Sequence, residues 1–374
     1  MFKQIIFSLL LSTLIHVMTG CRGDILLPPP EHTAVTGGQD GPVAGFYLLN
    51  EGNMGSNRAE IDYFNLHQGT FIRNIYTAMN PDAVKELGDV GNDLLIAHGQ
   101  LYATINCSHK VEVMQASDGR RIGQIDIPNC RFLAADEHHL YVSSYVGPVQ
   151  PDPHAPRGAV FRIDPVTLQI DGIAQTGYQP EQMAIAQGKL YVANSGGYRA
   201  PDYDNTLTVI DLESFTVTGS IYVAPNLYGI IYDEARHQLL VSSQGNDTDI
   251  QSDVYTVSVP DGSVTGSLDI RCNRMALHDD CLYIISREPG SKKTSFIKYD
   301  LETETRKGSF ITAPSPDMTT PYCLAINPYN GDIYVGDARN YVSSGRLHCF
   351  SSSGEYRWTV TTGDIPSSIA FYIL

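Results

Sequence analysis

A short phrase recurs seven times along this chain, and it constrains the fold more than any other feature of the sequence. It is three residues long: an apolar residue comes first, the middle residue is usually aromatic, and the third residue is again apolar. A polar loop follows it. Neighbouring copies are 39 residues apart at the closest (Tyr102 to Tyr141) and 55 at the farthest (Tyr47 to Tyr102). Repeats of this length are typical of β-propeller blades. The copies are Phe46-Tyr47-Leu48, Leu101-Tyr102-Ala103, Leu140-Tyr141-Val142, Leu190-Tyr191-Val192, Leu239-Leu240-Val241, Leu282-Tyr283-Ile284 and Ile333-Tyr334-Val335.

The residues around each copy predict four antiparallel strands per repeat. An apolar first strand such as 182–186 precedes the phrase, a strand of alternating character such as 206–211 follows it, and a short fourth strand such as 218–223 closes the unit. Alternation with period two gives each strand one buried face. A β-helix would show a shorter period, and a sandwich does not require seven similar repeats. Only residues 82–87 suggest a helical turn, so the chain is expected to be all-β.

The two ends of the repeat region predict a closed ring. The first copy, at Phe46, has no strand before it, whereas residues 366–371 look like a first strand without the three that should follow. The C-terminal strand would therefore complete the N-terminal blade, and closure removes the exposed edges of an open array. The sequence thus predicts one domain, residues 43–374, folded as a seven-bladed β-propeller.

The N-terminus has the features of an export signal. Lys3 supplies a positive charge, residues 5–17 are mainly apolar, and Gly20-Cys21 resembles a bacterial lipobox. Residues 1–20 are therefore expected to be removed and Cys21 to be lipidated. That modification would anchor the protein in the outer membrane, with the body displayed at the cell surface. An ordinary signal peptide followed by a chance cysteine is the alternative.

The residues after Cys21 predict a flexible tether rather than a packed element. Residues 21–42 contain Pro28-Pro29-Pro30 and Gly37-Gly38 and show no periodic pattern. No second apolar run reaches the length of a membrane span. The formal net charge is -16 and no basic stripe is present, which argues against nucleic acid as a partner.

The cysteines leave two interpretations open. None forms a CxxC pair, so a zinc ribbon is not indicated. Export permits disulfides, and Cys272 and Cys281 flank an expected hairpin turn at 278–280, across which they could pair. Alternatively, all are small buried hydrophobic residues. Besides Cys21 they are Cys107, Cys130, Cys272, Cys281, Cys323 and Cys349.

One face of the predicted propeller carries the most varied loops. The second-to-third strand loops and the connections between blades open on this face, and they are rich in Asn, Tyr, Arg and Gly. Amide groups, flat phenol rings and rigid guanidinium donors suit a large polar ligand with amide groups and a flat body. The alternative is that Asn and Gly serve turn geometry only. The candidate ligand-binding residues are Asn129, Arg131, Tyr145, Tyr178, Gln179, Tyr198, Arg199, Asn226, Tyr228, Asn273, Arg274, Tyr322, Arg339 and Tyr341.

Signatures of catalysis are sparse. There is no GxSxG nucleophile elbow and no HExxH helix, so no catalytic residue, metal ligand or cofactor is predicted. Residues 86–93 cluster acids and could suggest a calcium loop, but they lack EF-hand spacing, and a turn before the next inner strand explains them more simply.

Longer phrases of the chain, beyond the repeat itself, span residues 49–57, 86–93, 105–108, 177–181, 191–198 and 361–366. These phrases resemble a known family, the YncE-like surface propellers of Bacteroides-type bacteria, and within it the BtuG-type lipoproteins. The resemblance implies a seven-bladed surface propeller that binds a corrinoid such as cobalamin on one face. It also implies a partner, a BtuB-type TonB-dependent outer-membrane transporter that receives the ligand. It does not supply the site residues, which come from loop position and chemistry.

Two other functions remain open at this point. A lactonase-like or lyase-like propeller enzyme would hold a metal in its channel with convergent polar side chains, and the blade connections offer Asn129, Asn226, Asn273 and Asp317. A scaffold for adhesion or assembly would instead present a flat apolar patch.

Overall fold

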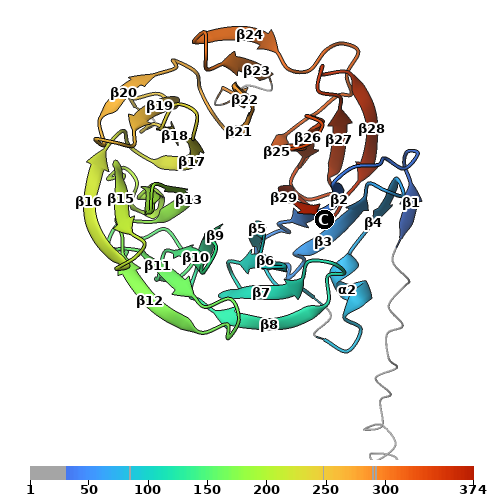
Figure 1. Ribbon diagram of the computed structural model, residues 1–374, viewed down its shortest axis with the longest axis horizontal. Helices are drawn as coiled ribbons and strands as arrows, with labels where there is room; N and C mark the ends of the chain where they lie inside the picture. The colour runs from blue at the N-terminus through green and yellow to red at the C-terminus, as the bar shows by residue number, and fades with distance from the viewer. Residues whose placement is uncertain (1–30, 84–85, 247, 289, 291–292) are drawn as a thin grey trace, which may run out of the picture.

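The protein is a ring of seven β-sheets around a central axis (Figure 1). The computed structural model describes residues 31–374 except 84–85, 247, 289 and 291–292. The expected signal peptide and the lipidated Cys21 lie outside the described residues. Within the described part of the chain, no helix is long and apolar enough to cross a membrane.

Each blade is an antiparallel sheet whose strands run outward from the axis in chain order, as the sequence predicts. Blade 1 consists of β29 (Pro366–Ile373), β2 (Val43–Asn50), β3 (Glu60–Asn65), β4 (Thr70–Ile72) and β1 (His32–Ala34). Blade 2 consists of β5 (Gly91–Ala97), β6 (Gln100–Ile105), β7 (Lys110–Gln115) and β8 (Arg121–Asp126). Blade 3 consists of β9 (Cys130–Ala135), β10 (Leu140–Ser144), β11 (Ala159–Ile163) and β12 (Ile170–Gln175).

The remaining four blades follow the same order. They are β13 (Pro180–Ala186), β14 (Lys189–Asn194), β15 (Thr206–Asp211) and β16 (Thr216–Tyr222); β17 (Leu227–Asp233), β18 (Gln238–Ser243), β19 (Asp253–Ser258) and β20 (Val264–Ser267); β21 (Arg274–His278), β22 (Cys281–Arg287), β23 (Thr294–Asp300) and β24 (Thr305–Ser309); and β25 (Pro321–Ile326), β26 (Ile333–Asp337), β27 (Arg346–Phe350) and β28 (Tyr356–Thr361).

The predicted closure of the ring is confirmed. The C-terminal strand β29 pairs with β2, in a register that sets Phe46 opposite Phe371. The closure also involves buried polar groups, because Asp62 accepts hydrogen bonds from the Asn50 side chain (2.8 Å) and the Gly363 backbone (3.3 Å). The first and last parts of the chain thus share one sheet and leave no open edge at the junction.

Two local expectations need correction. Part of the expected tether, residues 21–42, is strand β1, which pairs with β4 and adds a fifth strand to blade 1. The short α-helix of the described residues is α2 (Ile75–Met79), which precedes the expected helical turn at 82–87; residues 84–85 of that turn lie outside the described part of the chain. Helix α2 begins where the Asn74 side chain accepts a hydrogen bond from the Thr77 backbone, an N-cap that stabilises a short helix.

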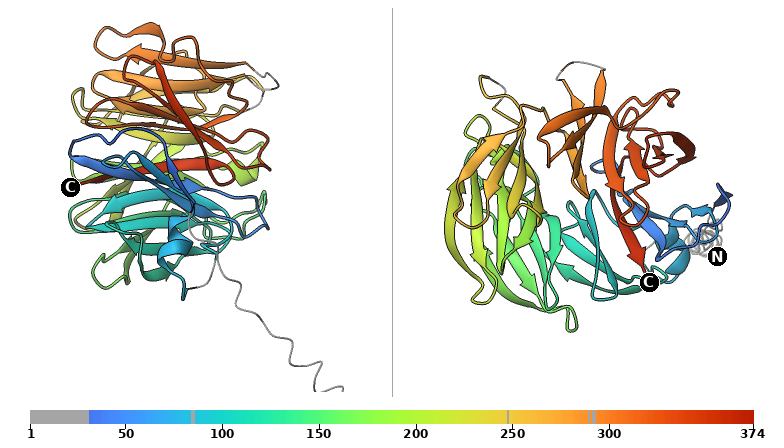
Figure 2. Two further views of the ribbon diagram at one scale, coloured as in Figure 1. Left: turned by 90° about the vertical axis from the view of Figure 1, so that its right-hand side faces the viewer. Right: turned by 45° about the horizontal axis from the view of Figure 1, so that its top comes forward.

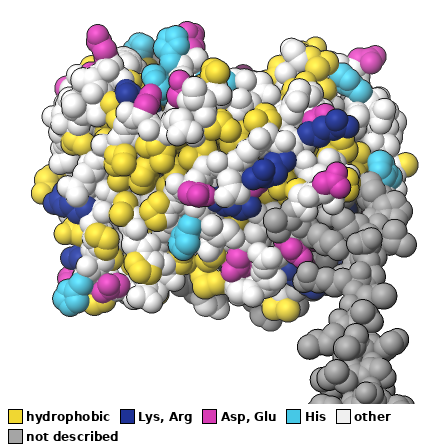
Figure 3. Space-filling model, turned by 90° about the horizontal axis from the view of Figure 1, so that it is seen from below, with side chains coloured by type: hydrophobic (Ala, Val, Ile, Leu, Met, Phe, Trp, Pro, Cys, Tyr) yellow, Lys and Arg dark blue, Asp and Glu magenta, His cyan; other side chains and the backbone are white. Residues whose placement is uncertain are grey.

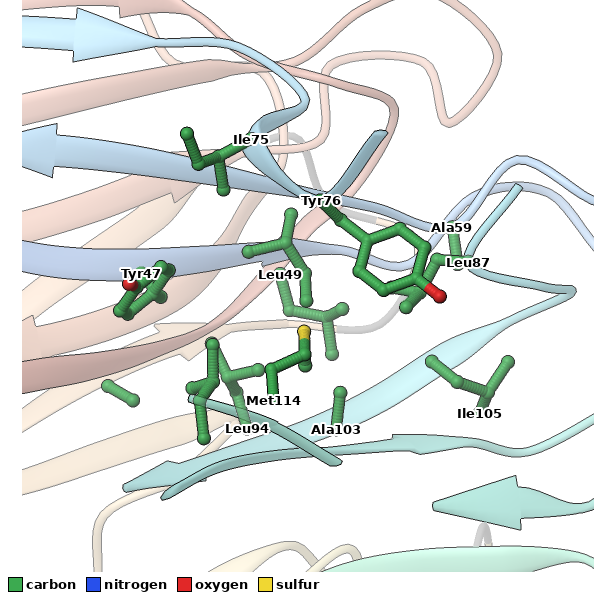
Figure 4. Close-up of a cluster of buried hydrophobic side chains, with 13 residues drawn as sticks. Tyr47, Leu49, Ala59, Ile75, Tyr76, Leu87, Leu94, Ala103, Ile105 and Met114 are labelled. Atoms are coloured by element: carbon green, nitrogen blue, oxygen red, sulfur yellow. The ribbon is translucent and has the colours of Figure 1, made fainter. Parts of the chain in front are cut away.

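The recurrent phrase forms the second strand of each blade, and its side chains fill the space between blades. Tyr47, Tyr102 and Tyr141 are each 1% exposed or less. Figure 4 shows one such cluster, in which Tyr47 and Leu49 of blade 1 face Leu94 and Met114 of blade 2. Large side chains between every pair of neighbouring blades explain why the sequence repeats this phrase: each copy packs against the next blade.

The cysteines follow the second of the two interpretations. All six in the described residues are free, and four of them are buried. Cys281 lies opposite His278 at the turn of the β21–β22 hairpin, whereas Cys272 precedes Arg274 at the other end of that hairpin. The two thiols therefore cannot pair across the strands as the sequence suggested.

The inner strands share a distortion that prepares the site. In six of the seven blades the register shifts by one residue near the start of the inner strand, whereas β21 shows no shift. A β-bulge of this kind redirects a side chain away from the regular pleat. The residues at the bulges are Asn92, Arg131, Glu181, Tyr228, Tyr322 and Ser367, and Arg274 begins β21.

Candidate functional site

The inner strands all begin on the face that carries the varied loops, which we call the mouth. β29 starts at the mouth with Pro366 and ends on the opposite face, where the C-terminus lies (Figure 2). A cavity of about 200 Å³ lies at the axis just inside the mouth. Its polar lining comes from the bulge positions and their neighbours: Glu51, Asn92, Asp93, Arg131, Gln182, Tyr228, Arg274, Tyr322, Ser367 and Ser368.

Aromatic rings and two arginines form a series of contacts along the mouth from blade 3 to blade 7. On one side, the Tyr198 ring meets Tyr145 edge-on at 4.9 Å, and the Arg131 guanidinium lies 4.7 Å from the Tyr145 ring. Arg131 is also 5.8 Å from the ring of Phe132, which meets Tyr228 edge-on at 5.7 Å. Each contact lies within the range in which aromatic pairs and cation–π contacts attract.

The other side continues the series. The Arg274 guanidinium is 5.3 Å from the Tyr228 ring and 4.6 Å from the Tyr322 ring, so two rings cover it. Tyr322 in turn meets Tyr341 edge-on at 5.8 Å. These eight residues, called the arginine–tyrosine row below, form a continuous floor across the mouth: Tyr198, Tyr145, Arg131, Phe132, Tyr228, Arg274, Tyr322 and Tyr341.

Arg131 is held in place by an acid from the next blade. Its Nη2 and Nε donate to Glu181 Oε2 at 3.1 and 3.3 Å. The other oxygen of Glu181 accepts hydrogen bonds from the Tyr145 hydroxyl and from Ser195 Oγ (3.2 Å). Burial alone would lower the pKa of Arg131, but the Glu181 carboxylate together with the Tyr145 and Tyr228 hydroxyl groups raises it well above its ordinary value. The charge of Arg131 is therefore balanced and its position is fixed.

Arg274 has no such partner. Its described hydrogen bond runs from Nη1 to the Asn273 carbonyl at 2.8 Å, and no carboxylate among the described residues lies within salt-bridge distance of it. Glu51 is the acid that influences it through space, and Tyr322 donates a hydrogen bond to that carboxyl group. Arg274 lines the cavity, so its remaining donors are available to a group that enters it.

Two carboxyl groups of the cavity are perturbed by burial. Burial raises the pKa of Asp93 to about 6, although hydrogen bonds from the Leu133 backbone (3.0 Å) and Ser368 Oγ (3.0 Å) oppose the shift. Burial also raises the pKa of Glu51, opposed by the hydrogen bond from Tyr322 and by the nearby arginines. Asp93 links blades 1, 2 and 3 at the axis, because its partners come from β29 and β9.

A larger groove opens at the rim between blades 3 and 4. It has a volume of about 640 Å³. Tyr178 lies at its centre, with the guanidinium of Arg199 4.0 Å and that of Arg157 5.5 Å from its ring. Loop residues 202–206 and the outer strand β16 complete its walls. This groove, called the rim groove below, is lined mainly by polar groups.

The structure distributes the fourteen candidate residues among distinct roles. Arg131, Tyr228, Arg274 and Tyr322 line the axial cavity. Tyr145, Tyr198 and Tyr341 belong to the arginine–tyrosine row, and Tyr178 and Arg199 line the rim groove. Asn273 accepts a hydrogen bond from the Arg287 backbone at 2.7 Å, and Arg339 donates to the Ser344 carbonyl at 3.3 Å, so both of these side chains hold loops of the mouth.

Three candidates serve the turns between blades. Asn129, Gln179 and Asn226 have φ angles of 46°, 46° and 59°, a conformation that Asn tolerates better than most residues. Asn129 and Gln179 are fully buried. Asn129 donates to the carbonyls of Gly147 and Pro148, both at 3.1 Å. For these residues the structure supports the turn-geometry alternative.

The sequence did not single out several residues that line or stabilise the cavity. Glu181 is the most important of these, and Glu51, Asp93, Gln182, Ser367 and Ser368 are the others. The signal that finds most of them is positional: all except Glu51, which follows β2, belong to the first residues of the inner strands. Aligning the seven repeats on the phrase would have placed Glu181 and Ser367 beside Arg131.

The acidic segment 86–93 follows the simpler of its two interpretations. Asp89 accepts hydrogen bonds from the backbone of Gly55 (2.8 Å) and Asn57 (3.2 Å), and it thereby holds the β2–β3 loop. Across the described residues, no group of three or more His, Cys, Asp or Glu side chains is placed to hold a metal ion.

The outer wall differs from the mouth. Figure 3 shows it from the side of β8 and β12, with apolar side chains interspersed among polar and charged ones. Ile122 of β8 and Ile173 of β12 are 49% and 62% exposed. The wall therefore carries dispersed apolar contacts, whereas the mouth concentrates arginines and tyrosines.

Comparison with known proteins identifies the fold and no family. No family model matches the chain, and no curated protein matches it significantly. Among solved structures, a hypothetical selenium-binding protein from Sulfolobus tokodaii is similar, with a TM-score of 0.65, 11% identity, and coverage of 89% of this chain and 94% of that one. A quinonprotein alcohol dehydrogenase-like protein from Bacteroides thetaiotaomicron has a TM-score of 0.61, 14% identity, and coverage of 88% and 78%.

A third similar structure is hydrazine synthase from Kuenenia stuttgartiensis, with a TM-score of 0.58, 15% identity, and coverage of 75% of this chain and 89% of that one. At such low identities these likenesses establish the propeller fold and carry no information about ligand or activity.

Proposed function

We propose that this protein is a surface lipoprotein that captures a corrinoid at its mouth and passes it to an outer-membrane TonB-dependent transporter. The observation that carries the proposal is the arginine–tyrosine row, a rigid floor of rings and guanidinium groups across the mouth. Preorganised side chains lose little conformational freedom when a ligand binds, which favours high affinity. The sequence resemblance to corrinoid-binding propellers points to the same ligand class.

The size of the cavity determines how such a ligand would bind. About 200 Å³ is less than the 300–1,000 Å³ or so that is typical of pockets enclosing a small molecule. A corrin macrocycle would therefore lie across the mouth, with one of its peripheral amide groups entering the cavity. Arg274 would donate to the amide oxygen and Glu51 would accept from the amide nitrogen, so no large charge is needed on the ligand.

The position of the N-terminal strand is compatible with capture from outside. β1 lies at the outer edge of blade 1, far from the axis (Figure 1). The described part of the chain therefore begins at the periphery of the ring and not at the mouth.

The test is calorimetric titration of residues 31–374, which include every strand of the ring, with cyanocobalamin in the presence and absence of EDTA. Tight one-to-one binding that EDTA does not change supports the proposal. Arg274→Gln should weaken that binding, whereas Arg120→Gln, an exposed arginine on the opposite face, should not.

Other outcomes favour the alternatives. If cyanocobalamin does not bind, the corrinoid assignment is wrong and the propeller fold remains. Metal-dependent hydrolysis of a lactone, abolished by EDTA, would indicate an enzyme. Binding of another protein through the outer wall, lost in Ile173→Asp, would indicate a scaffold.

A further inference from the structure

The rim groove is larger than the axial cavity, and the arginine–tyrosine row does not account for it. Its volume of about 640 Å³ lies within the range typical of small-molecule sites. The blade 3–4 connection and the β14–β15 loop form its mouth-side walls, and β16 forms its outer wall. The rim groove therefore accommodates a larger ligand group than the axial cavity of about 200 Å³ does.

The chemistry of the groove is set by two arginines that share one tyrosine. Among the described residues, neither Arg157 nor Arg199 has a carboxylate within salt-bridge distance. Arg199 donates to the Pro153 carbonyl at 2.7 Å, and its Nε is buried without a hydrogen-bond partner. Seven other arginines of the described residues, in contrast, pair with an acid. Two unpaired guanidinium groups facing one hollow are suited to a phosphate group, whose oxygens accept from several donors at once.

The two acids of the groove do not cancel this preference. The Asp204 carboxylate already accepts hydrogen bonds from the Tyr178 backbone (2.8 Å) and from the Thr206 hydroxyl (2.7 Å) and backbone (3.0 Å). It therefore stabilises the loop. Asp202 is exposed, where water screens its charge. The guanidinium donors are the groups still available to a ligand.

A single short turn links the groove to the row. The 3₁₀ turn η1 (Gly197–Arg199) follows Gly196, whose φ of 62° favours glycine and where a Cβ would lie 2.2 Å from the Asp204 nitrogen. Within this turn Tyr198 packs against Tyr145 of the row, and the next residue, Arg199, packs against Tyr178 in the groove. The two sites are therefore adjacent, and one ligand can occupy both.

We infer that the rim groove is a subsite for the phosphate-bearing nucleotide tail of a ligand whose flat ring covers the row. Arg157 and Arg199 bind the phosphate. Tyr222, whose side chain is 73% exposed at the outer end of the groove, offers a ring face to the base. This inference rests on the proposed function for the identity of the ligand, and it adds which part of the ligand gives selectivity.

The experiment compares two corrinoids that differ in the tail. Cyanocobalamin carries the nucleotide tail and dicyanocobinamide lacks it. Wild type, the double variant Arg157→Gln/Arg199→Gln and the control Arg120→Gln are titrated with both. The double variant should bind cyanocobalamin about tenfold to a hundredfold more weakly, because two charge-assisted hydrogen bonds are lost. Its affinity for dicyanocobinamide should stay at the wild-type value, and Arg120→Gln should change neither.

The outcomes separate this inference from the proposed function. An equal loss of affinity for both ligands, or no loss for either, overturns the subsite while the capture function stands. A wild type that binds neither corrinoid overturns both. Because Arg157 is exposed and makes no hydrogen bond within the described residues, Arg157→Gln alone retains the fold and should give a smaller loss, again for cyanocobalamin only.

Discussion

The two arginines of the row occupy similar places at the axis and have opposite surroundings. Arg131 donates two hydrogen bonds to Glu181, and that carboxylate is saturated by Tyr145 and Ser195. Arg274 lies between two tyrosine rings and donates to a backbone carbonyl only, among the bonds described. On the blade 3–4 side of the mouth, called the locked side below, the donors of Arg131 are bound by groups of the protein itself. On the blade 5–7 side, called the open side below, Arg274 keeps donors for a ligand.

The difference shows that residue type alone does not define a binding group. A buried ion pair contributes little net stability over apolar packing, but removal of one partner is costly because the other charge is left buried. The locked side is therefore expected to respond to mutation through stability, and the open side through affinity. The predictions below test that division.

The largest effect is expected for Glu181→Ala. It leaves the charge of Arg131 without a partner and removes the acceptor of Tyr145 and Ser195. The free energy of unfolding should fall by about 3–5 kcal/mol, measured by urea denaturation. Glu137→Ala, an exposed acid, is the control and should change it by less than about 0.5 kcal/mol. An equally small change in the free energy of unfolding for Glu181→Ala would mean that the Arg131–Glu181 ion pair does not stabilise the fold.

The next largest effect is expected in the pH dependence of the free energy of unfolding. The pKa of Asp93 in the folded state, about 6, is above its ordinary value of 3.8 because of burial. Its protonated form therefore favours the folded state. The corresponding stability is complete below pH 4 and is lost as pH rises through 6, by at most about 3 kcal/mol. Urea denaturation of wild type and Asp93→Asn between pH 4 and 7 measures this loss.

The asparagine variant should show a flatter profile, because it has no proton to lose. Glu60, with a folded-state pKa of about 7 caused by burial, remains in both proteins and gives a shared slope at higher pH. Identical profiles would show that Asp93 does not link the inner strands in its neutral form.

Arg274→Gln should affect ligand binding more than stability. We expect about a tenfold to hundredfold loss of affinity for cyanocobalamin, because donors to the entering group are lost. The free energy of unfolding should change by no more than about 1 kcal/mol, since no acid is left unpaired. Titration calorimetry and urea denaturation of the same samples provide both values. A large loss of stability with unchanged affinity would reverse the roles assigned to the two sides.

The ring of blades and the arginines and tyrosines of the cavity could be predicted from the sequence, whereas the role of Glu181 could not. Strand alternation and the repeated aromatic phrase are local patterns, so the blades and the closure by β29 could be predicted. Arg131, Arg274, Tyr228 and Tyr322 could be found because they follow the blade connections. The role of Glu181 depends on packing between neighbouring blades and on a bulge, which bring it to an arginine 50 residues away. Nothing local in the sequence encodes that contact.

The asparagine-rich connections show where two explanations coincide. Asn129 and Asn226 have the amide chemistry of a ligand-binding loop, and they also tolerate positive φ. Both explanations predict the same residue at the same place, so the sequence alone does not separate them. The backbone conformation shows the turn role directly, because the chain must reverse direction between blades whether or not a ligand binds, and ligand binding by these residues stays a prediction.

The smallest predicted effect lies at the end of the row. Tyr341 is 42% exposed and contacts Tyr322 edge-on, so Tyr341→Ala removes one weak aromatic contact from the ring that covers Arg274. Affinity for cyanocobalamin should fall about twofold to fivefold, with no measurable change in thermal unfolding. Tyr329→Ala, which removes a 65% exposed tyrosine from a turn on the opposite face, is the matched control and should leave affinity unchanged. If both variants bind as wild type does, the ligand contacts Arg274 without the support of the outer rings, and the open side of the mouth ends at Tyr322.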